Sequence, residues 1–481
     1  MQQHQTRFIK PQRRRLTRAV ALGVGGATAL VGFATSGGSG ASAVEAPTAR
    51  SLAVQVVDGT LPDGAKYQIR MPKNWNGTLA LFGHGLKLPI EDNPVEIAPD
   101  PDVGNYLLQR GVALAGSDFG TTGWAVEDAI RDQLATRSAV VNRFGKPART
   151  IAWGLSMGGQ VATALAERYP VKFGGALPIS GAEAGAVGGW DHFLDGAFVF
   201  DTLLGAGTPL KVIGIEDPGA NIGLASSVLT NAVQGATGRA RLALTAAVLQ
   251  LPGGFGAGGP VRRPTTEERF SARMAWLAAP YLQVAFGVRA DVERRAGGNP
   301  STNVGVNYAK LLNQSGQRAD VEAMYSKAGL SLADDLATLT KAPRIGFDRD
   351  ARHYLEANAS FTGRISRPVL TLHNVADGAL PSSQERALRD AVHGQGRDAF
   401  LRQYFVNRPG HGIFTPAETI AAFEVLMARV KTGSWPCVTP AAMNARAKKL
   451  GPALNTGGGD PVAPAYVEHQ PLPFPRPFVV H

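Results

Sequence analysis

The chain has a single cysteine, Cys437, among its 481 residues. An intramolecular disulfide is therefore excluded, and the hydrophobic core must stabilise the fold, which is feasible for a chain of this length. Metal-binding patterns are missing as well, because there is no H-x-x-E-H sequence and no pair of cysteines. The sequence predicts no metal and no cofactor, so its chemistry must come from ordinary side chains.

Acidic residues are missing from the first 43 positions, which contain six Lys or Arg residues. A twin arginine within residues 12–18 precedes a mildly apolar, Gly/Ala-rich run, residues 19–35, and the small residues Ala41-Ser42-Ala43. This pattern is typical of a bacterial export signal, of the twin-arginine type, cleaved after Ala43. A membrane anchor is the alternative, but the run is shorter than the ~20 strongly apolar residues that a span requires. We expect residues 1–43 to be a signal peptide and the mature protein to be secreted, without a stable membrane anchor.

Removing the signal lowers the formal net charge of the chain from +11 to +5. The mature chain contains no basic patch interleaved with aromatic residues, which nucleic-acid-binding segments commonly have. The sequence therefore predicts no nucleic-acid partner.

The motif around Ser156 is the most informative feature that is present. Ser156 is the centre of a G-x-S-x-G sequence, residues 154–158. The apolar residues 149–153 predict a buried strand before it, and the Ala-rich residues 160–169 predict a helix after it. Strand, G-x-S-x-G and helix together form a nucleophile elbow, a strained turn that lifts the serine hydroxyl above a sheet. The glycines are needed because side chains there would crowd the turn.

Two later loops each follow an expected strand. Asp377 and Gly378 follow the apolar residues 368–373, and His411 lies between two glycines after residues 401–406. A capping box with proline at the first helical position, residues 415–418, predicts that a helix begins just after His411. A histidine between two glycines on a loop has no packing role, so we predict a chemical one.

The elbow, the sequence Gly83-His84-Gly85-Leu86 after the strand at residues 79–82, and the order Ser156, Asp377, His411 resemble the α/β-hydrolase superfamily. The resemblance implies a mostly parallel, eight-stranded sheet flanked by helices, with a large, mainly helical lid insertion. It implies that Ser156, Asp377 and His411 form a catalytic triad. It also implies that the backbone N–H groups of Leu86 and Met157 form the oxyanion hole.

Four other polar residues have alternative interpretations. Glu183 follows the expected sixth strand, where some members of the superfamily carry their acid, and it is the rival of Asp377. His84 is expected to order its loop rather than to transfer protons. Asp118, at the end of a strand, is equally consistent with a structural role and with a place on the pocket floor. His373 ends a strand, and we expect it to pack or to form local hydrogen bonds.

The organisation of the chain follows from these motifs. Residues 44–181 and 362–435 supply the two parts of the α/β-hydrolase core, and residues 182–361 form an insertion between them. Helical patterns at residues 239–251, 265–276 and 331–339 predict that the insertion is mainly helical, and in this superfamily an insertion here is the lid. We expect its aromatic residues to serve mostly as its own core: Phe198, Phe200, Trp276 and Phe286. Residues 436–481, rich in Pro and Gly, are expected to be an irregular tail.

Within the superfamily the core resembles exported bacterial serine esterases, with residues 72–77 as a further local likeness. The resemblance implies hydrolysis of a small-molecule carboxylic ester through an acyl-enzyme. The alternative is an exported serine aminopeptidase, because such peptidases also carry large helical lids. A polyester depolymerase is less favoured, since these enzymes leave the serine open to a solid surface. A binding protein without activity would lack a triad residue, and all three are present. The sequence does not indicate the oligomeric state.

Overall fold

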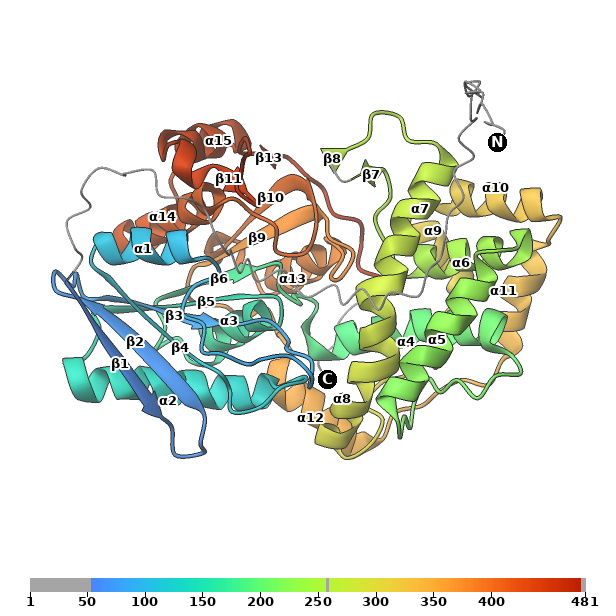
Figure 1. Cartoon of the computed structure of the whole chain (residues 1–481), viewed down its shortest axis with the longest axis horizontal. Helices are drawn as coiled ribbons and strands as arrows, with labels where there is room; N and C mark the ends of the chain where they lie inside the picture. The colour runs from blue at the N-terminus through green and yellow to red at the C-terminus, as the bar shows by residue number, and fades with distance from the viewer. Residues whose placement is uncertain (1–52, 257–258, 477–481) are drawn as a thin grey trace, which may run out of the picture. The chain divides into compact units, whose positions relative to one another are not determined.

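The computed structural model describes residues 53–256 and 259–476 of the chain, and Figure 1 shows their arrangement. The predicted signal peptide, residues 1–43, lies outside the described residues. Within the described part of the chain, no helix is long and apolar enough to cross a membrane.

A single large sheet forms the centre of the core segments. It has nine strands among the described residues, in the order β1-β2-β4-β3-β5-β6-β9-β10-β13. The six strands from β4 to β10 run parallel to one another, and β1, β2 and β13 add antiparallel pairings at the two edges. The mostly parallel sheet is thus confirmed, but the expectation of eight strands is wrong. The strands are β1 (Val54–Thr60), β2 (Lys66–Pro72), β3 (Thr78–Gly83), β4 (Val112–Ser117), β5 (Arg149–Leu155), β6 (Gly175–Ile179), β9 (Val369–Ala376), β10 (Leu401–Pro409) and β13 (Tyr466–Val467).

Helices cover both faces of this sheet, which explains why its central strands are apolar throughout. In Figure 1, α1, α14 and α15 lie above the sheet and α2 lies below it. Alternate residues of one strand enter the two layers: Leu79 and Leu81 pack on the α2 side, whereas Ala80 and Phe82 pack on the α14 side. The flanking helices are α1 (Pro101–Gln109), α2 (Val126–Phe144), α3 (Met157–Arg168), α13 (Ser383–Gly394), α14 (Pro416–Thr432) and α15 (Pro440–Lys449).

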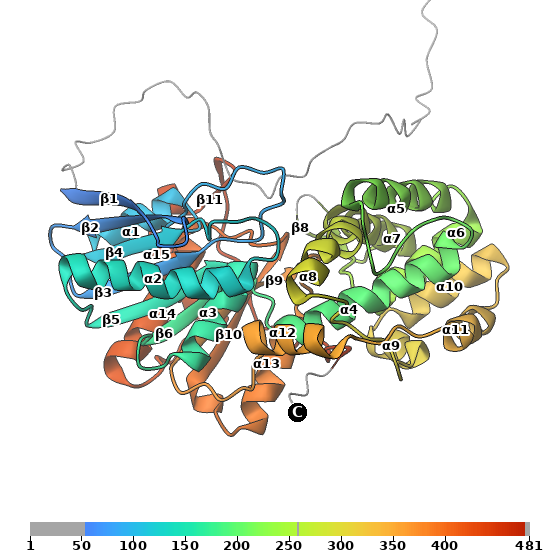
Figure 2. The same ribbon diagram turned by 90° about the horizontal axis from the view of Figure 1, so that it is seen from below.

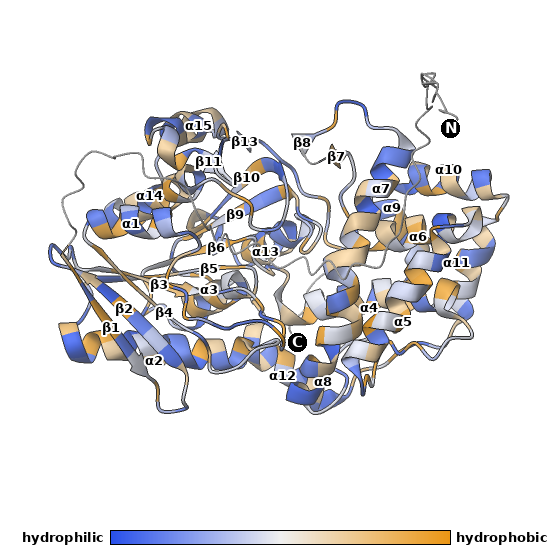
Figure 3. Ribbon diagram, in the orientation of Figure 1, coloured by the Kyte–Doolittle hydropathy of each residue, from blue (hydrophilic) through white to orange (hydrophobic). Residues whose placement is uncertain are grey.

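Residues 182–361 fold mainly into helices around a hydrophobic core of their own. Figure 3 shows both hydrophobic and hydrophilic residues along these helices, as expected of amphipathic helices around a shared core. The helical patterns predicted from the sequence correspond to α6, α7 and α11. The elements are α4 (Gly185–Phe200), α5 (Pro218–Ala232), α6 (Ala236–Val248), β7 (Phe255–Gly256), β8 (Gly259–Pro260), α7 (Thr266–Trp276), α8 (Arg289–Ala296), α9 (Tyr308–Gln314), α10 (Arg318–Ala328), α11 (Leu332–Lys341) and α12 (Arg349–Ala359).

The C-terminal segment is more ordered than the sequence predicts. Instead of an irregular tail, it supplies α15 and the edge strand β13, which pairs with β10. Thr439 caps α15 by accepting a hydrogen bond from the backbone N–H of Ala442, and Pro440 occupies the first turn. Proline starts a helix at this position rather than breaking it, which is why its abundance was misleading. The buried Tyr466 of β13 donates a hydrogen bond to the Glu418 carbonyl and fixes the segment to α14.

Candidate active site

Ser156 lies in a strained turn between β5 and α3. Its φ is 57° and its ψ is −120°, a left-handed φ that non-glycine residues rarely adopt. A Cβ at Gly154 would lie 2.6 Å from the Gly83 carbonyl oxygen, and one at Gly158 would lie 2.6 Å from the His84 carbonyl oxygen. The two glycines therefore allow β5, α3 and the loop after β3 to approach closely, as the motif predicts. Ser156 is left partly exposed at the C-terminal edge of the sheet.

The loop after β3 runs beside the elbow. A Cβ added to Gly85 would lie 3.5 Å from the Cβ of Ser156, so the backbone of this loop lies next to the serine. The buried His84 ring stacks on Phe119 with centroids 4.1 Å apart, and its Nδ1 lies 2.6 Å from the Gly85 carbonyl oxygen. Burial lowers the pKa of His84. These contacts match the expected loop-ordering role of His84. Leu86 is partly buried in the same loop, and Met157 is the buried first residue of α3.

Asp377 and His411 lie in contact at the ends of β9 and β10. His411 Nδ1 lies 2.7 Å from Asp377 Oδ2, and the other oxygen of this fully buried carboxylate accepts hydrogen bonds from the Ala379 and Leu380 N–H groups. Glu183 accepts instead from the Thr163 hydroxyl at 2.8 Å. Burial and the nearby charge of Glu385 raise the pKa of Glu183 well above its ordinary value, which favours the protonated form of this group.

The His411 loop is packed against the elbow. The N–H of Gly412 lies 3.2 Å from the Ser180 hydroxyl oxygen, and a Cβ added to Gly412 would lie 3.4 Å from Cδ2 of Leu155, which precedes the serine. Because β5, β6, β9 and β10 are successive parallel neighbours, their C-terminal ends meet at one edge. The structure brings Ser156, Asp377 and His411 to this edge.

One aromatic residue of the insertion reaches the site. The Trp276 indole lies so close to Gly378 that a Cβ there would be 2.7 Å from Trp276 Cδ1. Phe198, Phe200 and Phe286 are buried in the insertion's own core, as expected of most of these aromatics. Trp276, at the end of α7, is only partly buried and lies beside the residue that follows Asp377.

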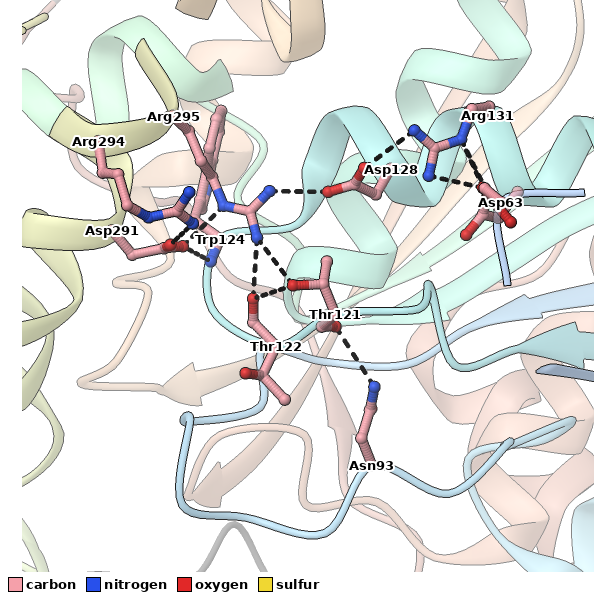
Figure 4. Close-up of polar contacts among 11 residues, drawn as sticks. Asp63, Asn93, Thr121, Thr122, Trp124, Asp128, Arg131, Asp291, Arg294 and Arg295 are labelled. Carbon is pink, nitrogen blue, oxygen red and sulfur yellow. Dashed lines mark hydrogen bonds and ion pairs between the residues drawn. The ribbon is translucent and has the colours of Figure 1, made fainter. Parts of the chain in front are cut away.

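The insertion is also tied to the core by a network of charges (Figure 4). Arg295 of α8 lies 2.8 Å from Asp291 of the same helix and 2.7 Å from Asp128 of α2. Its guanidinium also donates to the Thr122 carbonyl, and Asp291 accepts from the Trp124 N–H at 2.8 Å. The network thus holds the loop between β4 and α2. The insertion also contacts the core through α12, which packs against α2 and α3 (Figure 2).

The structure identifies the hydrogen-bond and ion-pair partners of Asp118 and His373, which the sequence did not indicate. Asp118 accepts hydrogen bonds from the Lys66 and Gly120 N–H groups, contacts that favour the structural interpretation. His373 lies 3.6 Å from Asp377 Oδ2 and 3.0 Å from Glu385 of α13. Glu385 was not identified from the sequence, although Thr371 and His373 alternate on β9 and point to a polar partner on one face.

No cluster of three or more His, Cys, Asp or Glu residues suited to a metal occurs in the described residues.

The chain was compared with family models, with known proteins and with solved structures. No family model matches the sequence. The chain is 31% identical over 431 residues to an o-phthalyl amidase from Xanthobacter agilis, which covers 83% of this chain and 91% of the relative. Among solved structures, feruloyl esterase B from Aspergillus oryzae matches 81% of this chain and 83% of its own, with 14% identity and a TM-score of 0.43. An acylaminoacyl peptidase from Pyrococcus horikoshii matches 79% of this chain and 42% of its own, with 8% identity and a TM-score of 0.36.

The strand order and the serine turn are those of the α/β-hydrolase fold predicted from the sequence. The amidase resembles this chain over most of both sequences. The protein is therefore a hydrolase of the α/β-hydrolase fold and belongs to the family of the o-phthalyl amidase.

Proposed function

We propose that the protein is a secreted serine hydrolase that cleaves small carboxylic esters through an acyl-enzyme on Ser156. The observation that carries this proposal is the 2.7 Å contact between His411 and the buried Asp377, at the sheet edge where the strained Ser156 turn lies. His411 accepts the serine proton during attack and returns it to the leaving group. Asp377 holds the imidazole in the required tautomer and stabilises the imidazolium.

The proposed oxyanion hole consists of the backbone N–H groups of Leu86 and Met157. Met157 begins α3, where the helix dipole also favours negative charge. The loop that carries Leu86 runs beside Ser156 at Gly85. Two backbone donors next to the serine would suit the oxygen of a tetrahedral intermediate. A second cycle, with water in place of the alcohol, releases the acid.

Amide hydrolysis at the same site is a second candidate, favoured by the relative named o-phthalyl amidase. An amide requires the same nucleophile and oxyanion hole, and His411 must protonate the departing nitrogen. The Trp276 indole beside Gly378 supplies a flat apolar surface suited to an aromatic acyl group. In the peptidase alternative, the same residues cleave the peptide bond that follows the amino-terminal residue of a peptide.

The insertion, residues 182–361, is proposed to be a lid that walls the acyl pocket. In an apolar pocket each accommodated methylene contributes roughly 0.8 kcal/mol of binding. Across a series of soluble p-nitrophenyl esters, kcat/KM should therefore rise with acyl length and then fall sharply. Insoluble polyester film should be a poor substrate. A flat profile or efficient erosion of film would mean that the insertion is not a lid.

A panel of chromogenic substrates separates the candidate reactions. It contains p-nitrophenyl esters, the 2-carboxybenzoyl amide of a chromogenic aniline, and aminoacyl nitroanilides. Preference for the esters supports the first proposal, preference for the 2-carboxybenzoyl amide replaces it with the second, and preference for the nitroanilides identifies a peptidase. Trp276→Leu should selectively lower kcat/KM for aromatic acyl groups. The matched control is Trp435→Leu. Trp435 is also a partly buried tryptophan, and its indole N–H donates to the Ala399 carbonyl.

Export is proposed from the twin-arginine sequence before residue 19 and the small residues up to Ala43. Expression of the full chain in a bacterium, followed by N-terminal sequencing of the exported protein, tests it. A mature protein that begins at Val44 is expected, and an uncleaved chain in the membrane fraction would identify an anchor.

A further inference from the structure

His373 is a fully buried histidine on β9, directly behind the proposed triad acid. Its Nε2 lies 2.8 Å from the Leu380 carbonyl oxygen and 3.6 Å from Asp377 Oδ2. Its Nδ1 lies 3.0 Å from Glu385 Oε1. Both ring nitrogens therefore face oxygen atoms, in a region without contact with solvent.

The hydrogen-bond partners define the protonation of this ring. The Leu380 carbonyl can only accept, so Nε2 must carry a hydrogen. On the opposite side, Glu385 Oε2 already accepts from the Thr371 hydroxyl and the Gln403 amide, each at 2.6 Å. One proton therefore remains between Glu385 Oε1 and His373 Nδ1. Imidazole is the stronger base, so this proton resides on the histidine and makes it an imidazolium.

The charge of the neighbouring groups favours the same assignment. Asp377 is a carboxylate, because its two oxygens receive the His411 Nδ1 contact and two backbone N–H groups. Burial alone lowers the pKa of His373, but the hydrogen bond and charge of Glu385, together with the charge of Asp377, raise it above its ordinary value. A cation between two carboxylates is the arrangement in which a buried histidine retains its proton.

We propose that His373 is a permanently charged positioning residue that controls the pH range in which the proposed triad works. This inference rests on the proposed roles of Asp377 and His411. A positive charge behind Asp377 opposes the binding of a further proton by the Asp377–His411 pair. His411 is thereby available as a base at lower pH than it would be beside an isolated carboxylate. The Nε2–H of His373 also holds the Leu380 peptide, whose own N–H donates to Asp377.

The other titratable groups around His373 do not replace its charge. Burial and the nearby charge of Glu385 raise the pKa of Glu183 well above its ordinary value, which favours the uncharged form. His469 of the C-terminal segment has its pKa lowered to about 4 by burial and by the charge of His373, and it is neutral too. Arg389 lies one turn after Glu385 on α13, and its guanidinium stays charged because arginine does not lose its proton in proteins. The charge directly behind Asp377 is therefore that of His373.

The variants His373→Gln and His373→Leu test the electrostatic role through the pH dependence of kcat/KM. Glutamine can still donate to the Leu380 carbonyl, whereas leucine cannot, and neither is charged. Both should move the acidic limb of the profile to higher pH by roughly half a unit to one unit. The matched control is His192→Gln in the insertion. His192 is a buried histidine whose pKa is lowered to about 4 by burial, so it is neutral, and its replacement should leave the limb in place.

A purely structural role predicts a different result. Gln and Leu would then lower kcat at every pH and leave the acidic limb where it is in the wild type, which would overturn the proposal. Neutron diffraction from wild-type crystals at neutral pH tests the charge without any variant. Deuterons on both ring nitrogens of His373 are expected, and a single deuteron would contradict the proposal. A wild-type protein that is inactive and is not labelled by a fluorophosphonate would instead refute the proposed triad, so the two failures are distinguishable.

Discussion

The core segments and the insertion hold their key residues by different means. Around Ser156 the positions are set by close backbone contacts that only glycine permits, at Gly154 and Gly158. The insertion is joined to the core through side chains, among them Arg295, which pairs with Asp128 of α2, and Val288 and Val292, which pack in the hydrophobic cluster of the core. A backbone requirement leaves a short, local motif in the sequence, whereas a charge network joins residues that lie far apart. The turn that carries Ser156 is therefore encoded locally, and the junction with the insertion is encoded at long range.

This difference predicts that a core substitution can remove catalysis while the fold survives. Asp377→Asn should lower kcat by about 10³ to 10⁴, because the amide no longer holds His411 in the tautomer that accepts the serine proton. Circular dichroism and thermal unfolding should remain close to those of the wild type. Steady-state kinetics with a soluble ester measures the effect.

Glu183→Gln is the control for this prediction. Glu183 is buried, its pKa is raised well above the ordinary value, and it accepts a hydrogen bond from Thr163 that glutamine can also accept, so glutamine should leave kcat nearly unchanged. If Glu183→Gln were instead the crippled variant and Asp377→Asn nearly normal, the assignment of the acid would be reversed.

A substitution at the junction should reduce stability rather than the chemical step. Arg295→Met leaves the Asp128 and Asp291 carboxylates without their shared cation, in a region where the Arg295 side chain is only 10% exposed. Because Asp128 and Asp291 keep Arg131 and Arg294 as partners, the loss should correspond to the hydrogen bonds of one charged group, about 1.5 to 3 kcal/mol. Denaturant unfolding measures the loss. Arg294→Met, on the same helix with a side chain that is 67% exposed, should change stability by less than about 1 kcal/mol; equal effects of the two variants would remove the distinction.

Within the insertion, a buried carboxyl should affect only the pH dependence of stability. Burial and the nearby charge of Asp191 raise the pKa of Asp195 to about 7, although Arg476 opposes this. The folded state retains a proton that the unfolded chain releases above pH 4, so the wild type loses stability as the pH rises from about 4 to 7. Three pKa units correspond to about 4 kcal/mol, so Asp195→Asn, which lacks this loss, should gain about that much stability relative to the wild type between pH 4 and pH 8. Melting temperatures across this range that run parallel for both proteins would contradict the shift.

The sequence predicted those parts of the fold that depend on short-range patterns. The strand, the turn and the helix around Ser156 follow from the spacing of Gly154 and Gly158, and the capping box at Thr265 and Glu268 marks the start of α7. The loops of Asp377 and His411 were found because each follows an apolar strand. The contact between these two residues depends on the neighbouring positions of β9 and β10, to which the order of the motifs already pointed.

The remaining features depend on pairings between distant residues. Trp276 meets Gly378 across about a hundred residues, and no spacing in the sequence marks that approach. His373 was expected to form local contacts, but its partner Glu385 belongs to the following helix, and its charge is evident only once both of its nitrogens have partners. The short strand β13 was missed because two residues are too few to produce an alternating pattern.

Labelling with a fluorophosphonate tests the central claim, that Ser156 is the nucleophile, most directly. The wild-type protein and Ser156→Ala are treated with the probe, and the adduct is mapped by peptide mass spectrometry. We expect the wild type to carry the adduct on Ser156, and the variant to carry none while turning over an activated ester on the order of 10⁶-fold more slowly. A variant that remains folded, is labelled at another serine and still cleaves the ester would contradict the account.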